Sequence, residues 1–225
     1  MAESKLIKKR KYHIYDEDIR KDKRSILGEL YPFMLVCGPP NSYKTTTVIN
    51  IIQKLSGLYD RVWLITQGAP DQKIIEQLDI PEESVLINEN VDESISEILN
   101  DEEDDDGENN RIIIADDVQS CLKKSPILQR LAISCFHNRT MLIIIAHGLA
   151  QTTPIYRKCC NILTVSPGIS PKEIRLNIHG YLRNFTVDEF TFIYKQANDL
   201  NLPLTLLSGQ EKKYLIGVSE YMLTF

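Results

Sequence analysis

Eight consecutive residues combine glycine, proline, lysine and hydroxyl side chains in a spacing that suits phosphate binding. They are Gly38, Pro39, Pro40, Asn41, Ser42, Tyr43, Lys44 and Thr45, and Thr46 follows them. An apolar run at 33–37 precedes the segment, and apolar residues recur at helical spacing over 46–55. Strand, tight loop and helix in this order form the context of a P-loop, because the unpaired N–H groups at a helix N-terminus bind phosphate oxygens.

Two residues of this segment have specific predicted roles. Lys44 would reach the β- and γ-phosphates of ATP, and Thr45 would place its hydroxyl on Mg²⁺. The whole segment from Gly38 to Thr46 is expected to contact the nucleotide. The sequence therefore predicts ATP and Mg²⁺ as ligands.

Tyr43 departs from the P-loop pattern G-x-x-x-x-G-K-[ST], because it stands where the second glycine belongs. That glycine lets the backbone approach the phosphates without a Cβ. Tyrosine would be tolerated if its φ is negative and its ring turns outward. The alternative is weakened or lost nucleotide binding.

A second candidate site follows the apolar run Ile112 to Ala115, which ends in Asp116 and Asp117. An apolar strand that closes on acidic residues is a Walker B pattern. Asp116 is predicted to face the Mg²⁺ shell, and Asp117 to polarise the attacking water. The alternative for Asp117 is a helix N-cap.

His147 follows another apolar run, Met141 to Ile145, and Ala146. A polar side chain at such a strand tip could sense the γ-phosphate. His147 is the first candidate and Gln151 the second. Alternatively, His147 merely caps the end of the strand.

The elements that must position these residues alternate along the chain. Apolar runs predict buried strands at 33–37, 61–66, 85–87, 112–115, 141–145 and 162–165, and helical spacing predicts helices at 46–55, 71–78, 91–99, 128–135, from 154, and at 187–197. Such alternation indicates an α/β fold whose mostly parallel sheet is covered by helices on both faces. Alternating residues at 174–178 predict an edge strand, and 214–218 a last strand. Gly38, Asp116 and His147 then all fall at carboxyl ends of strands, where active sites of such sheets lie.

Composition fits one domain with two charged appendages. The chain has 225 residues, of which 43% are hydrophobic and 25% charged. We expect a basic arm at 1–28 and an ATPase domain at 29–225 that carries an acidic surface loop at 101–110. The run Lys8 to Lys11 in the arm could serve nuclear import or phosphate binding, or could simply be a solvated terminus.

The net charge is −5, so bulk charge gives no argument for nucleic-acid binding. The five cysteines lie mostly in apolar segments, which suggests reduced thiols and an intracellular location. Apolar stretches are far shorter than the ~20 residues that span a bilayer, so no membrane role is expected.

The order of these motifs resembles the FtsK–HerA superfamily, and within it the packaging ATPases of poxviruses, giant viruses, virophages and Polinton-like elements. The likeness covers roughly residues 30–167 and includes the segment His137 to Arg139 before an Ile-rich strand. It implies a RecA-like (ASCE) P-loop NTPase fold and a homo-oligomeric ring that drives double-stranded DNA into a preformed capsid, with capsid proteins as further partners.

The resemblance also assigns a role to Arg139, which matches the position from which the family supplies an arginine finger to the neighbouring subunit. The alternative is a surface residue at the entry of a strand. Two positions depart from the family: His147 stands where glutamine is frequent, and Tyr43 where glycine is.

Three functions remain open at this point. The first is an ATP-driven translocase of double-stranded DNA that packages a viral genome, in the host cytoplasm or nucleus or with the virion. The second is a non-packaging P-loop ATPase or helicase of viral replication. The third is a P-loop protein that has lost hydrolysis and acts as a structural partner, for which Tyr43 is the only support.

Overall fold

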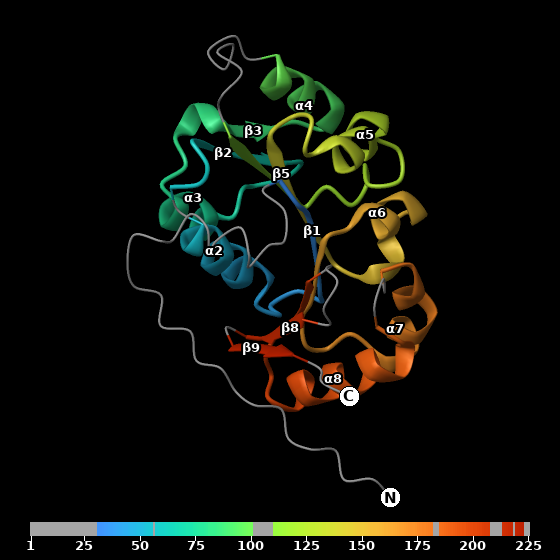
Figure 1. Ribbon diagram of the computed structural model, residues 1–225. Helices are drawn as coiled ribbons and strands as arrows, with labels where there is room; N and C mark the ends of the chain where they lie inside the picture. Colours follow the sequence, from blue (N-terminus) through green and yellow to red (C-terminus); the bar gives the residue numbers. More distant parts are fainter. Residues whose placement is uncertain are drawn as a thin grey trace, which may run out of the picture.

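The computed structural model describes residues 31–55, 57–100, 110–181, 185–207, 213–217 and 219–222 (Figure 1). The expected basic arm, and all but the last residue of the expected acidic loop, lie outside them. One nine-stranded sheet organises the described residues. Its strands are β1 (Phe33–Cys37), β2 (Arg61–Thr66), β3 (Val85–Ile87), β4 (Arg111–Asp116), β5 (Thr140–Ala146), β6 (Ile162–Val165), β7 (Leu204–Leu207), β8 (Lys213–Ile216) and β9 (Ser219–Met222).

The strand order is β3-β2-β4-β5-β1-β6-β7-β8-β9. The first six strands in this order are parallel, and β7, β8 and β9 continue the sheet antiparallel. The strand before the P-loop, β1, lies between β5 and β6, and β5 separates it from β4. The carboxyl ends of β1, β4 and β5 therefore meet at one edge of the sheet, as the sequence predicts.

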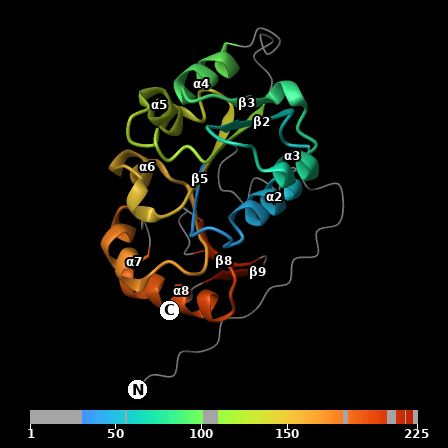
Figure 2. The ribbon, with the colours of Figure 1, turned by 180° about the vertical axis from the view of Figure 1, so that it is seen from behind.

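Helices cover both faces of this sheet. They are α2 (Lys44–Lys54), α3 (Gln72–Leu78), α4 (Val91–Leu99), α5 (Pro126–Ser134), α6 (Pro154–Cys159), α7 (Pro171–Asn177) and α8 (Val187–Asp199), with 3₁₀ turns η1 (Glu82–Ser84), η3 (Leu149–Gln151) and η4 (Ile178–Gly180). Figures 1 and 2 show α2 and α3 on one side and α4 to α7 on the other.

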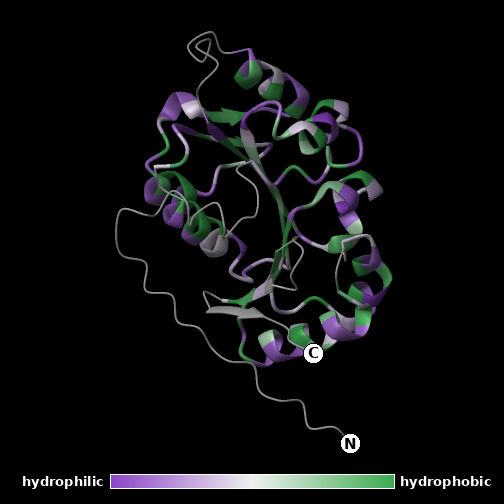
Figure 3. Ribbon diagram, viewed as in Figure 1, coloured by the Kyte–Doolittle hydropathy of each residue, from purple (hydrophilic) through white to green (hydrophobic). Residues whose placement is uncertain are grey.

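The two faces bury separate apolar clusters, because side chains alternate along a strand. In β1, Phe33, Leu35 and Cys37 join the cluster that contains residues of α4 to α8. Met34 and Val36 join the cluster that contains residues of α2 and α3. Figure 3 shows the corresponding pattern, with hydrophobic strands inside and hydrophilic residues on the outer sides of the helices.

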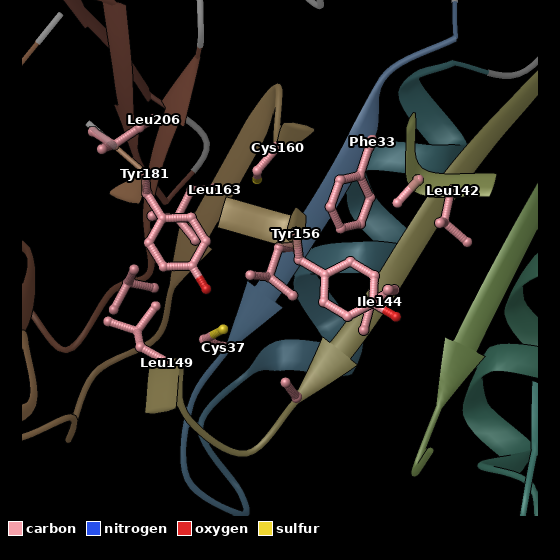
Figure 4. Close-up of a cluster of buried hydrophobic side chains, with 14 of the residues drawn as sticks. Phe33, Cys37, Leu142, Ile144, Leu149, Tyr156, Cys160, Leu163, Tyr181 and Leu206 are labelled. Atoms are coloured by element: carbon pink, nitrogen blue, oxygen red, sulfur yellow. The ribbon is translucent and has the colours of Figure 1, made fainter. Parts of the chain in front are cut away.

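The end of β1 that leads into the P-loop rests on tightly packed side chains. Figure 4 shows Cys37 between Tyr181 and Leu149 on one side and Tyr156 on the other. All four are buried, and burial raises the pKa of the Cys37 thiol well above its usual value. Cys37 is therefore a packing residue that helps to fix where the loop begins.

The prediction of an edge strand at 174–178 is wrong, because this segment forms the end of α7 and the start of a 3₁₀ turn. The Ser170 hydroxyl accepts a hydrogen bond from a backbone N–H of the first turn and caps α7. Ile174 and Ile178 are buried and lie four residues apart, whereas Leu176 between them is 68% exposed. The spacing of the buried residues is thus helical, and the alternation in the sequence is coincidental.

The prediction of one last strand at 214–218 is incomplete. β8 covers most of this segment, but the sheet also contains β7 before it and β9 after it, which the sequence pattern does not predict. Among the described residues, no helix is both long and apolar enough to cross a membrane.

Candidate nucleotide-binding site

The P-loop begins at Gly38, where the chain has no room for a side chain. A Cβ at this position would lie 2.4 Å from Ser42 Oγ and 2.5 Å from Ser166 Cβ. The Gly38 N–H donates to the carbonyl of Ala146 over 3.1 Å, which extends the pairing of β1 with β5. Gly38 therefore lets the loop fold tightly at the carboxyl edge of the sheet.

The N-terminus of α2 is open to an anion. The helix begins at Lys44, no side chain caps it, and its first turn contains no acidic residue. Its first N–H groups are thus available to an anion such as phosphate. The Lys44 ammonium donates to the carbonyl of Pro39 over 2.7 Å, so it folds back across the loop. Burial lowers the pKa of Lys44, and the negative charge of Asp116 opposes this.

Tyr43 meets one of the two conditions under which tyrosine would be tolerated. Its φ is +65°, in the left-handed region, so the condition of a negative φ is not met. Its ring does turn outward and is 50% exposed, with the hydroxyl 3.4 Å from Asn201 Nδ2. Tyr43 thus keeps the backbone geometry that favours glycine there, and its ring points out of the core.

Asp116 is the last residue of β4, and Asp117 follows it. Burial raises the pKa of Asp116, and the neighbouring charges of Asp71 and Asp117 add to this, whereas the Asp117 N–H and Lys44 oppose it. The Asp117 N–H donates to Asp116 Oδ1 over 3.0 Å. No helix begins at Asp117, since the next described helix is α5, so the N-cap alternative is excluded. Asp117 instead has a φ of +53° and an exposed carboxylate.

His147 lies beside Asp117. Its Nε2 atom is 3.9 Å from Asp117 Oδ1, and 42% of its side chain is exposed. The His147 N–H donates to Gln151 Oε1 over 3.1 Å. Gln151 therefore holds the turn after β5, and His147 is the polar side chain that stands next to the Walker B pair.

Arg139 is not brought to this edge. It precedes β5, so it lies at the opposite end of the strand that His147 follows. Its side chain is exposed, its φ is +47°, and its carbonyl accepts from the Arg111 N–H over 3.1 Å. Within one chain, Arg139 and the P-loop are separated by the length of β5.

One carboxylate at the carboxyl edge was not predicted as a site residue. Asp71 follows β2 and caps α3, and its Oδ2 atom accepts a hydrogen bond from Thr45 Oγ1 over 3.0 Å. The sequence signal was available: Asp71 stands between a parallel strand and a helix, at the same edge as Asp116. The sequence pattern places it only at the start of the helix predicted at 71–78.

These residues fit a magnesium–nucleotide complex. Thr45 and Asp116 supply a hydroxyl and a carboxylate oxygen, which are ligands that Mg²⁺ prefers, and Asp71 contacts Thr45. In the described part of the chain, no three His, Cys, Asp or Glu side chains are grouped so as to hold a metal ion by themselves.

Comparison with solved structures identifies the fold. The genome-packaging NTPase B204 of Sulfolobus turreted icosahedral virus 2 in complex with sulfate matches 84% of this chain and 96% of its own, with 12% identity and a TM-score of 0.63. The same protein in complex with AMPPCP matches 88% and 100%, with 12% identity and a TM-score of 0.58. The chain has a RecA-like P-loop NTPase fold.

A bacterial protein shares this fold. The EssC fragment with ATPases 2 and 3 from Geobacillus thermodenitrificans matches 86% of this chain and 39% of its own, with 11% identity and a TM-score of 0.53. These neighbours are named as a genome-packaging NTPase and as ATPases, so the NTPase fold that the motifs indicate is confirmed. No protein-family model and no curated protein matches the sequence.

Proposed function

We propose that this chain is an ATP-hydrolysing motor that moves double-stranded DNA and packages a viral genome into a capsid. One observation carries the proposal: the P-loop, the Walker B pair and His147 meet at one edge of a sheet whose fold matches a genome-packaging NTPase over nearly its full length. Residues far apart in the sequence converge there, as a working site requires.

Each residue at this edge has a task in hydrolysis. The N-terminus of α2 and Lys44 bind the phosphates of ATP, and Thr45 and Asp116 hold Mg²⁺. When bound, Mg²⁺ neutralises charge that develops on the phosphates. Asp117 orients and polarises the attacking water, because its carboxylate is exposed beside His147, at the edge of the sheet where the P-loop lies, rather than bound in a helix cap. His147 senses the γ-phosphate from beside Asp117.

The proposed motor is a ring of identical subunits. Arg139 acts on the nucleotide of the neighbouring subunit, which is supported by its exposure and by its distance from the P-loop of its own chain. Double-stranded DNA is the substrate, and capsid proteins are the docking partners. The match to a protein named as a genome-packaging NTPase supports a role in packaging.

The test is ATP hydrolysis by the purified protein with and without duplex DNA, for wild type and Lys44→Ala. We expect Mg²⁺-dependent hydrolysis that duplex DNA stimulates in wild type and that is absent in Lys44→Ala. A strand-separation assay on the same DNA distinguishes the packaging motor from a replicative helicase, because a motor that moves along intact duplex leaves the strands paired. Hydrolysis that duplex DNA does not stimulate would show that the protein is an ATPase but would reject the proposed DNA motor.

The non-hydrolysing alternative is favoured only by Tyr43. Its outward ring meets one condition for a working loop, whereas its positive φ does not meet the other. Measured binding of ATP without any turnover, with or without DNA, would favour that alternative.

A further inference from the structure

We propose that Asp71 positions the Thr45 hydroxyl for the metal ion, by accepting its proton and leaving the oxygen lone pairs free to bind Mg²⁺. This role rests on the proposed Mg²⁺–ATP site. The Walker B pair is the usual place to look for acidic groups in such a site. Asp71 lies outside both motifs and comes from the loop after a different strand.

The contact that carries the proposal joins Thr45 Oγ1 to Asp71 Oδ2 over 3.0 Å. A hydroxyl has one proton to donate and two lone pairs. An ionised carboxylate can only accept, so in this contact the proton points towards Asp71. The lone pairs of Thr45 then point elsewhere, and a metal ion can use one of them.

Asp71 is held in place by a second task. Its Oδ1 atom accepts from the Lys73 N–H over 3.0 Å, which caps α3, and its carbonyl accepts from the Ile74 N–H over 3.0 Å. Ile74 is fully buried in the cluster beneath α2 and α3. The two carboxylate oxygens thus have separate partners, so the one facing Thr45 cannot turn away without uncapping the helix.

The other nearby carboxylate already has a partner. Asp116 Oδ1 accepts from the Asp117 N–H over 3.0 Å. The negative charge of Asp71 helps to raise the pKa of Asp116, which places the two carboxylates within electrostatic reach of each other. A divalent cation between Thr45 and Asp116 would offset this repulsion, so Asp71 also contributes charge to the site.

Asp71→Asn separates the two tasks of the residue. Asparagine is as good an N-cap as aspartate, so α3 stays capped through its amide oxygen. The group facing Thr45 becomes an N–H donor, which takes up a lone pair of the hydroxyl instead of its proton. The variant should therefore fold normally and lose the orientation of Thr45.

The readout is the affinity for a fluorescent ATP analogue, measured with Mg²⁺ and with EDTA. Wild type should bind more tightly with Mg²⁺. In Asp71→Asn the gain from Mg²⁺ should fall by about tenfold, the scale of losing a group that orients a metal ligand. Binding in EDTA and the melting temperature without nucleotide should remain as in wild type.

Two controls isolate the contact. Glu76→Gln removes the same charge from an exposed position on α3 and should leave the Mg²⁺ gain unchanged. In a Thr45→Val background, Asp71→Asn should lower the gain by less than it does beside Thr45, because the hydroxyl that it orients is gone and only its charge is lost.

Three results would overturn the proposal. An unchanged Mg²⁺ gain in Asp71→Asn means that Thr45 needs no orienting partner. A larger gain means that Asp71 withholds the hydroxyl from the metal. If wild type binds the analogue equally well with Mg²⁺ and EDTA, the proposed Mg²⁺–ATP site itself fails.

Discussion

The two ends of the central strands differ in what the chain completes by itself. At the carboxyl ends, Lys44, Asp71 and Asp116 come from three different segments and interact with the P-loop or with each other, and His147 lies beside Asp117. At the amino end of β5, Arg139 is exposed and belongs to none of these contacts. The seven residues of β5 separate the two ends by about 23 Å at 3.3 Å per residue.

The amino end also exposes apolar surface beside its arginine. Ile133 is 63% exposed and Phe136 is 69% exposed, in the segment that leads to Arg139. Under the proposed function, one chain therefore builds the nucleotide site, whereas the outward-facing arginine needs a neighbouring subunit to act on a nucleotide. Substitutions at the two ends should therefore fail in different ways.

The largest effect is expected for Lys44→Ala at the carboxyl end. It removes a charge-assisted contact to the phosphates, which weakens nucleotide binding by about 1.5–3 kcal/mol. Hydrolysis should fall to background, and both are measured on the purified variant. Lys54→Ala, at the other end of α2, is the control and should behave as wild type. Normal hydrolysis by Lys44→Ala would refute the site assignment.

Arg139→Ala should lower hydrolysis by about 10³–10⁵-fold if it supplies an arginine finger, while ATP binding persists. Hydrolysis per subunit in wild type should also rise with protein concentration. Arg130→Ala, an exposed arginine on α5, is the matched control.

Mixing the variants tests whether Arg139 acts between subunits. Arg139→Ala and Asp117→Asn proteins should be nearly inactive alone, and a mixture should regain partial activity where an intact Asp117 meets an intact Arg139. If mixed rings form but stay inactive, Arg139 does not act on the neighbouring subunit and is a surface residue.

Asp117→Asn should bind ATP as wild type does and hydrolyse it about 10²–10⁴-fold more slowly, because the geometry survives but the base does not. Binding and single-turnover hydrolysis are measured side by side. Asp79→Asn, an exposed aspartate that also has a positive φ, controls for the loss of one charge. Loss of ATP binding would make Asp117 a structural or metal-binding residue instead.

The smallest effect concerns Tyr43, tested by comparing Tyr43→Gly with Tyr43→Ala. Both remove the ring, but only glycine adopts the left-handed conformation without strain, which costs other residues about 1–2 kcal/mol. Tyr43→Gly should therefore exceed Tyr43→Ala in melting temperature and nucleotide affinity. Equal melting temperatures and affinities of the two variants would show that the left-handed conformation at position 43 causes no strain. An affinity for Tyr43→Gly tenfold above wild type would favour the decayed-site alternative.

Much of the carboxyl end was predictable from sequence. The strands around the P-loop are buried on both faces, so their apolar runs stand out, and each ends at a polar residue that marks the edge of the sheet. Parallel strands place those ends together, which is why Asp116 and His147 were expected near Lys44.

The remaining features depend on tertiary contacts. The left-handed φ of Tyr43 is set by the tight turn into α2 and has no signature in a tyrosine. The bond between Thr45 and Asp71 depends on how α3 packs on α2, which no local pattern reports. At 174–178, alternation hid a helix because only the burial of Ile174 and Ile178 reveals its period.

The most direct test of the account is displacement of a third strand from a triplex on duplex DNA. With ATP and Mg²⁺, wild-type protein should release the third strand while the duplex stays paired. A non-hydrolysable analogue, or Lys44→Ala with ATP, should release none. A triplex that remains intact while the wild-type protein hydrolyses ATP would contradict the claim that hydrolysis at this edge of the sheet moves the protein along DNA.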